Sequence, residues 1–218
     1  MFEYGKERLS ELDPNTIWLF FRSDIGSSAQ FYQKRGGKPW YQYHLMVHQS
    51  KIMKDDKCSS GTEYFDDMIP YNANYFDEYL EVRADAFLDL NTLIDARPYD
   101  ERERKDDIRK WTEKHKDSIW LFIKDGHIVG SIAIYEGFFD EIFVEKEDQQ
   151  KGLGSEIVTR ALSYCRSQKW SPMLCVVTGN QRAIHLYEKM GFEIVQTLEM
   201  NRLFSLNKAP DYSGPIGG

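Results

Sequence analysis

The order of apolar and polar residues predicts a mixed α/β protein from about residue 68 onward. Residues 68–71 have the pattern of a short opening strand, and apolar side chains recur at helical spacing over 75–90. A second, highly charged helix is expected around 100–115. A strand and two helices should therefore precede the central part of the chain.

A hairpin is expected next, because two strand patterns at 118–124 and 127–135 flank Asp125-Gly126, a dipeptide typical of tight hairpin turns. The pattern of a further strand, EIFVE at 141–145, leads directly into the glycine-containing segment QQKGLG at 149–154. The centre of the chain thus has the order strand, loop, helix.

The helix after this segment should run from about residue 154 to just before Trp170. Its apolar residues share one helical face: Ile157, Val158, Ala161, Leu162 and Cys165. The continuous apolar run MLCVV at 173–177 is typical of a buried strand. A short helix ending at Met190 with Gly191 after it, and a strand over 192–206, complete the pattern.

The N-terminal part is less regular, with strand patterns at 16–23 and 40–48. The chain therefore divides into an N-terminal extension at 1–65, a main domain at 66–206 and a tail at 207–218. The tail is rich in proline and glycine, a composition typical of disorder.

Composition narrows the function classes. The net charge is −7 over 218 residues, which disfavours nucleic acid as a partner because binding it relies on clustered Lys and Arg, whereas a cationic small substrate would suit this charge. The start of the chain is charged, and no apolar run approaches the ~18 residues of a membrane span. We expect a soluble cytoplasmic protein without a membrane partner.

Neither the cysteines nor the histidines indicate a metal centre. Three cysteines are an odd number without a C-x-x-C pair, and Cys165 and Cys175 fall in apolar patterns that predict core positions. His44 and His48 have a metal-like spacing but no acidic residue nearby. No metal is expected.

The segment QQKGLG predicts an anion site. A helix that begins at about Gly154 directs unpaired backbone N–H groups and the positive end of its dipole at one spot, and Lys151 can add a positive charge at the rim. A dinucleotide fold would need a third glycine where Ile157 stands, and the G-K-[ST] ending of a triphosphate loop is absent. The remaining candidate is the pyrophosphate of another carrier.

The sequence resembles the GNAT superfamily of acyl-CoA-dependent N-acetyltransferases over about residues 66–206. The family motif [QR]-x-x-G-x-[GA] matches residues 149–154, and N-x-x-A-x-x-L-Y-x-x-x-G-F matches 180–192 at every position. The resemblance implies the GNAT fold of the α/β (α+β) class, a mixed and mostly antiparallel sheet flanked by helices, here with a β-containing N-terminal extension. It also implies acetyl-CoA as the co-substrate.

The resemblance implies a role for each matching residue. Phe143 and Val144 should offer strand edge to the pantetheine amides, Asn180 should contact the pantetheine arm, and Tyr187 should protonate the departing thiolate. Asn180 is also a candidate N-cap, and Tyr187 could be only a half-buried aromatic residue. The loop residues expected to bind the pyrophosphate are Gln149, Gln150, Lys151, Gly152, Leu153, Gly154 and Ser155.

The group that takes the proton from the attacking amine is left open between Asp140, Glu141 and Glu145. A regular strand would put Glu141 and Glu145 on one face and Asp140 on the other. A bulge, usual in this strand of the family, would change that parity. Asp140 and Glu141 are the catalytic candidates, and solvated surface carboxylates are the alternative for all three.

The acceptor is expected to be a primary amine of a small molecule. N-terminal acetyltransferases of the superfamily commonly have a Glu five residues before the motif asparagine, where this chain has Cys175. A protein-lysine or N-terminal acetyltransferase is one alternative, and a non-catalytic acyl-CoA-binding regulatory protein is another. The extension suggests an assembly role as well, with a second copy of the chain as candidate partner in a homodimer.

Overall fold

A computed structural model describes residues 16–22, 26–49, 67–94 and 100–204 of the chain. The strands are β1 (Thr16–Arg22), β2 (Lys38–His48), β3 (Asp67–Pro70), β4 (Ile119–Lys124), β5 (His127–Tyr135), β6 (Phe138–Val144), β7 (Met173–Val177) and β8 (Phe192–Phe204). The predicted disordered tail at 207–218 lies outside the described residues.

Five α-helices and four short 3₁₀ helices connect the strands within these ranges. The α-helices are α2 (Gly26–Gln33), α3 (Phe76–Ile94), α4 (Lys105–His115), α5 (Leu153–Gln168) and α6 (Gln181–Lys189). The 3₁₀ helices are η2 (Ala73–Tyr75), η3 (Glu101–Arg104), η4 (Lys116–Ser118) and η5 (Lys146–Asp148). The predicted helices and strands from residue 67 onward are confirmed, whereas α2 was not predicted.

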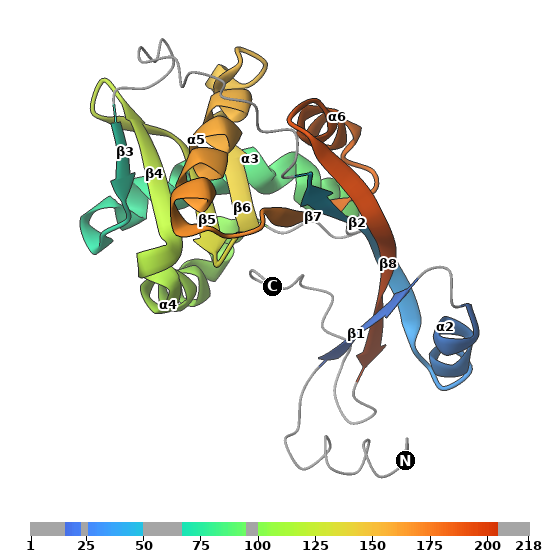
Figure 1. The fold of residues 1–218 in the computed structure, drawn as a ribbon. Helices are drawn as coiled ribbons and strands as arrows, with labels where there is room; N and C mark the ends of the chain where they lie inside the picture. Colours follow the sequence, from blue (N-terminus) through green and yellow to red (C-terminus); the bar gives the residue numbers. More distant parts are fainter. Residues whose placement is uncertain (1–15, 23–25, 50–66, 95–99, 205–218) are drawn as a thin grey trace.

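All the described strands belong to one sheet, in the order β1-β8-β2-β7-β6-β5-β4-β3. Only β6 and β7 run parallel, and every other neighbouring pair is antiparallel. The predicted mixed, mostly antiparallel sheet is therefore confirmed. Figure 1 shows α5 in front of the sheet and α3 behind it.

Two tight turns set the register of β4, β5 and β6. Asp125 and Gly126 both have positive φ, 51° and 81°, as a two-residue hairpin turn that follows the strand twist requires. Glu136 and Gly137 repeat this at 49° and 98°, so β6 begins at Phe138 instead of residue 141 as the sequence predicted. The Glu136-Gly137 turn is the signal that the sequence analysis missed.

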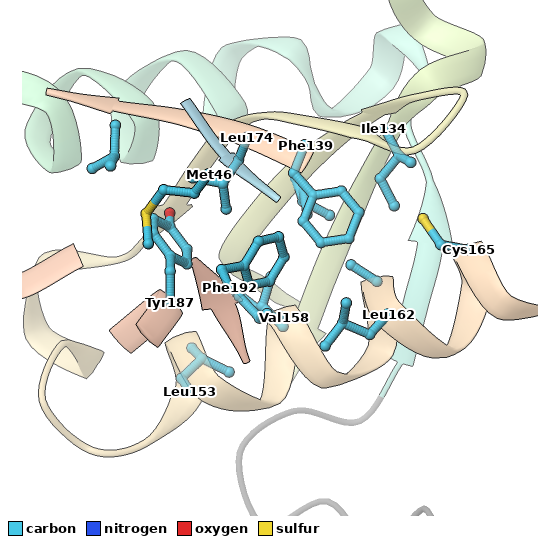
Figure 2. Close-up of a cluster of buried hydrophobic side chains, with 14 of the residues drawn as sticks. Met46, Ile134, Phe139, Leu153, Val158, Leu162, Cys165, Leu174, Tyr187 and Phe192 are labelled. Carbon is cyan, nitrogen blue, oxygen red and sulfur yellow. The ribbon is translucent and has the colours of Figure 1, made fainter. Parts of the chain in front are cut away.

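The hydrophobic core lies on both faces of the sheet. The cluster on the α5 face, drawn in Figure 2, contains buried side chains from α5 together with Met46, Phe139 and Leu174 of three different strands. The cluster on the α3 face joins α3 and α4 to β4 and β5, with Tyr79 and Ile108 fully buried. The central strands are therefore covered by helices on both sides.

Strand β2 lies in the interior of the sheet, although it comes from the N-terminal segment. It pairs with β7 over Tyr43–Val47 and with β8 over Lys38–His48, while β1 lies at the edge beside β8. Figure 1 shows β2 in blue between two strands from the end of the chain. The N-terminal segment is thus built into the sheet, and its Met46 is completely buried in the core.

Candidate active site

A cleft opens where β6 and β7 separate. The two parallel strands pair only through Phe138 with Met173 and Phe139 with Leu174, and they diverge beyond these positions. The resulting cavity of about 890 Å³ is lined by β6, β7, α3, α6 and the loop after β6. On the cleft side, β6 beyond Phe139 has no strand partner, so its backbone edge is open to a ligand.

The loop at one end of the cleft has the geometry of an anion site. Gln150 and Gly152 have φ of 65° and 98°, and Gly152 is the N-cap of α5 without any side-chain cap. The backbone N–H groups from Gln150 to Gly154 donate to no acceptor among the described residues. Several free donors at the positive end of a 16-residue helix favour a negatively charged ligand.

Not every loop residue predicted to bind the pyrophosphate lines the cleft. Gln149, Gln150, Gly152, Gly154 and Ser155 do. The Leu153 side chain is buried in the core, so only its backbone can face a ligand. Lys151 lies outside the lining, and its Nζ is 3.0 Å from Asp148 Oδ1, so an acidic neighbour already pairs with its charge.

Arg182 is a cation at this end of the cleft that the sequence analysis missed. It lies in the first turn of α6, and its Nη1 donates to Gln149 Oε1 at 3.1 Å, while Gln149 Nε2 donates to the carbonyl of Val144 at 3.1 Å. Among the cationic residues that line the cleft, only Arg83 accompanies it. Arg182 lies two residues after the motif residue Asn180, and this spacing could have indicated its place at the cleft.

Tyr187 and Asn180 both lie along the cleft on or beside α6. Tyr187 is 7% exposed and lies at the end of the core cluster nearest Met46 (Figure 2), and burial raises the pKa of its phenol, which therefore keeps its proton at neutral pH. The Asn180 side chain accepts a hydrogen bond from the N–H of Ala183 at 3.2 Å. The N-cap role considered for Asn180 is confirmed.

Strand β6 contains a bulge at the cleft. Ser131 pairs with Phe143 and Ala133 with Asp140, so two residues of β6 face one residue of β5. Glu141 within the bulge has a φ of 48°, which is unusual for a residue with a side chain. The expected bulge is present, and both Asp140 and Glu141 line the cleft, whereas Glu145 does not.

The two cleft carboxylates have different surroundings. The Glu141 carboxylate is ion-paired with Arg83, and burial raises the pKa of Glu141 to about 7 against the opposing attraction of that guanidinium. Asp140 Oδ1 accepts a hydrogen bond from the Glu141 N–H at 2.9 Å. Burial also raises the pKa of Asp140, and that carboxyl has no ion pair among the described residues.

The acetyltransferase (GNAT) family model matches residues 79–192, which contain the divergent strands, the loop and α6. The chain belongs to the GNAT acetyltransferase family. Its GNAT motif residues come from two separate stretches of sequence, 149–154 and 180–192, and the fold brings them together along one cleft.

One curated relative within the family is the peptidyl-lysine N-acetyltransferase YiaC of Escherichia coli (strain K12), which is 32% identical over 77 residues. The match covers 35% of this chain and 50% of that protein, so the chain spans about half the length of this relative.

Solved structures share the fold. A conserved protein of unknown function from Staphylococcus epidermidis superposes with a TM-score of 0.66 at 17% identity, covering 94% of this chain and 78% of that one. A GCN5-related N-acetyltransferase from Sphaerobacter thermophilus gives 0.63 at 17% identity, covering 93% and 66%. At these identities the likeness concerns the fold alone.

The sequence also drew attention to one cysteine and two histidines outside the two motifs. Cys175 was predicted to be a core residue and is exposed, because β7 turns one face to the cleft. His44 contacts Thr197 Oγ1 through Nδ1 at 2.9 Å, and His48 packs against the Phe192 ring. Across the described ranges, no helix is long and apolar enough to cross a membrane, and no three potential metal-ligating side chains gather.

Proposed function

We propose that this GNAT protein transfers an acetyl group from acetyl-CoA to a primary amine of a small molecule. One observation carries the proposal. The open edge of β6 runs along a single cleft from a loop of unpaired N–H groups to a buried tyrosine and a carboxylate. A ligand with a phosphate at one end, amides in the middle and a reactive thioester at the other end suits this arrangement.

The loop and the strand edge would hold the two parts of CoA. The N–H groups of residues 150–154 would donate to the pyrophosphate, with Arg182 as the neighbouring cation. The backbone of Phe143 and Val144 would pair with the pantetheine amides as an added strand does. The Phe143 side chain is buried against Tyr79 and Phe87, which keeps this edge in place.

The chemistry would proceed by direct attack. The amine nitrogen forms a bond to the acetyl carbon, the C–S bond breaks, and the departing sulfur takes the electron pair. Tyr187 would donate its phenolic proton toward that sulfur. Because burial raises the pKa of this phenol, hydrogen bonding to the developing thiolate stabilises it more readily than complete proton transfer does.

Asp140 suits the role of proton acceptor better than Glu141. The Glu141 carboxylate is engaged by the Arg83 guanidinium, whereas Asp140 keeps acceptor capacity and lines the cleft. An ammonium beside Asp140 would pass its proton to that carboxylate and become the neutral nucleophile. The raised pKa of Asp140 makes it a stronger base than an ordinary carboxylate.

The walls of the cleft favour an amine on an organic body. Tyr41 of β2 and Phe87 and Leu90 of α3 provide aromatic and apolar surface in the cleft that Asp140 and Cys175 also line. A lysine side chain of a protein is the second candidate acceptor, because the Escherichia coli relative is named as a peptidyl-lysine acetyltransferase.

Calorimetric titration with acetyl-CoA and with CoA is the first test. We expect micromolar binding by the wild type and none by Gly152→Glu, because a carboxylate would lie at the anion site and a side chain would strain φ of 98°. Absence of binding by the wild type would refute the proposal.

Thiol release with small amines and with lysine peptides then decides the acceptor class. Tyr187→Phe should lower kcat about 10²-fold or more and leave the Kd for acetyl-CoA unchanged. Turnover of the peptides alone would replace the small-molecule proposal with the lysine one.

A further inference from the structure

A buried arginine is held between two glutamates at the end of the cleft away from the loop. Arg83 of α3 is 3% exposed, and Glu101 of η3 and Glu141 of β6 are 4% and 6% exposed. Arg83 Nη2 donates to Glu141 Oε1 at 2.9 Å, and its Nε lies 2.7 Å from Glu101 Oε2. The rings of Phe87 and Trp111 lie 4.9 Å and 5.5 Å from the guanidinium carbon.

Stability alone is a weak explanation for this buried ion triad (Arg83, Glu101 and Glu141). Taking three charges out of water is unfavourable, and apolar side chains of similar volume often support a fold equally well. The ion triad joins three separate elements, and all three of its members line the cleft, as does Asp140 on β6. Its location indicates a role in shaping the site.

The ion triad acts on the bulge of β6. The backbone of Glu141 has a φ of 48°, a conformation that a residue with a side chain keeps only when its surroundings hold it. On the cleft side no strand pairs with the chain at this point, because the contact with β7 ends at Phe139. The ion pair between Arg83 and the Glu141 carboxylate is therefore the interaction that holds the bulge on the cleft side.

Glu141 also connects the guanidinium to Asp140. Its carboxylate is bound by Arg83, and its backbone N–H donates to Asp140 Oδ1 at 2.9 Å. A movement of the Glu141 side chain would turn this N–H and with it the Asp140 carboxylate. Arg83 thus controls the orientation of a group that it does not itself contact in the described structure.

We propose that Arg83 is a positioning residue, which holds the β6 bulge through Glu141 so that Asp140 and the strand edge face the cleft in a fixed geometry. Glu101 pairs with the guanidinium through Nε and Nη2 and so keeps Arg83 in place. The effect on catalysis rests on the proposed function. The effect on the conformation of β6 does not, so the two can be tested separately.

The first test compares two arginines that both link α3 to η3, of which only Arg83 also binds β6. Arg83→Met removes the buried cation, and Arg102→Met removes an arginine that also links η3 to α3 but lies outside the cleft, 31% exposed, in ion pairs with Glu81, Asp85 and Asp100. We expect kcat to fall at least tenfold in Arg83→Met, with the Kd for acetyl-CoA within twofold of wild type. Arg102→Met should leave both within twofold.

A charge-free variant separates positioning from support of the fold. Arg83→Met alone leaves two buried carboxylates without a cation and can fail to fold. The triple variant Arg83→Met, Glu101→Gln, Glu141→Gln contains no buried charge at these positions and similar side-chain volume. If its thermal midpoint is close to wild type and kcat stays at least tenfold low, positioning is supported. Recovery of kcat to within threefold would overturn the proposal.

Amide hydrogen exchange tests the conformational claim without turnover. In the triple variant, exchange over residues 139–144 should be at least tenfold faster than in wild type, while exchange over 149–155 stays unchanged. Unchanged exchange over 139–144 would overturn the proposal even if the enzyme proves active. If the wild type acetylates no amine, the proposed function fails, and this measurement still decides whether Arg83 holds the bulge.

Discussion

Replacing Met46 by alanine tests whether the N-terminal segment is an integral part of the fold. Met46 is completely buried in the core cluster that also contains Leu174, and its backbone lies opposite Leu174 of β7 and Ile194 of β8. Burying a methionine side chain is worth about 1.5–3 kcal/mol, and the cavity left by truncation adds to the loss. We therefore expect Met46→Ala to lower the free energy of unfolding by about 3 kcal/mol.

Urea denaturation, monitored by tryptophan fluorescence and circular dichroism, measures this loss of unfolding free energy. For a chain of this size, about 3 kcal/mol corresponds to a fall in Tm of roughly 6–12 °C. Leu174→Ala, on the strand paired with β2, should shift the same single transition by a similar amount. Gln42→Ala, at an exposed position of β2, should change the free energy of unfolding by less than about 0.5 kcal/mol.

Either of two results would show that the N-terminal segment is not an integral part of the fold. One is a loss below about 1 kcal/mol in Met46→Ala while Leu174→Ala shows its full effect. The other is a separate early transition in Met46→Ala, because a segment that unfolds independently would not take part in the cooperative unfolding of the sheet.

Three further predictions concern the N-terminal segment, the Glu136-Gly137 turn and the pH dependence of kcat. A fragment that starts at residue 62 lacks β2, which exposes the pairing edges of β7 and β8. It should therefore show no cooperative unfolding transition. A cooperative transition would contradict the observed sheet order. Gly137→Ala should lower the free energy of unfolding by roughly 1–2 kcal/mol more than Gly126→Ala does in urea denaturation. Both turns need positive φ, but only at Gly137 would a Cβ also meet the Ser171 carbonyl oxygen at 2.7 Å. Equal losses would show that the turn relaxes. If Asp140 accepts the proton, kcat should fall as the pH decreases through the pKa of Asp140, because only the ionised carboxylate is a base. Burial raises this pKa above that of an ordinary aspartate. If the fall in kcat at low pH survives in Asp140→Asn, another group causes it.

Local sequence signals predicted most of the fold from residue 67 onward because there the pattern and the turn chemistry agree. Asp125-Gly126 fixed one hairpin, and Gly191, with φ of 89°, ends the last helix as expected. Helix α2 was missed because its sequence, GSSAQFYQ, has little apolar periodicity and begins with residues that favour turns. It packs against β1 and β2, the strands next to it in the sequence, and the pattern of the helix alone does not reveal that contact.

The parts of the candidate site that lie within the two motifs could be predicted from the sequence. The contacts between residues far apart in the chain could not. Tyr187 and the loop at 149–155, apart from Lys151 and Leu153, line one cleft. The partner of Glu141 could not be predicted, since Arg83 lies 58 residues away on a different element. The exposure of Cys175 arises because β6 and β7 diverge, which an apolar run cannot reveal.

The place of β2 in the sheet has a consequence for how the protein is made. The ribosome completes β2 early, but both of its neighbours, β7 and β8, are synthesised only after the whole central part of the chain. At about 5–20 residues per second, this interval is on the order of ten seconds, during which β2 with its apolar Met46 has no partner strand. The nascent chain is thus a candidate for chaperone binding, and slow translation of the central helices would prolong its exposure.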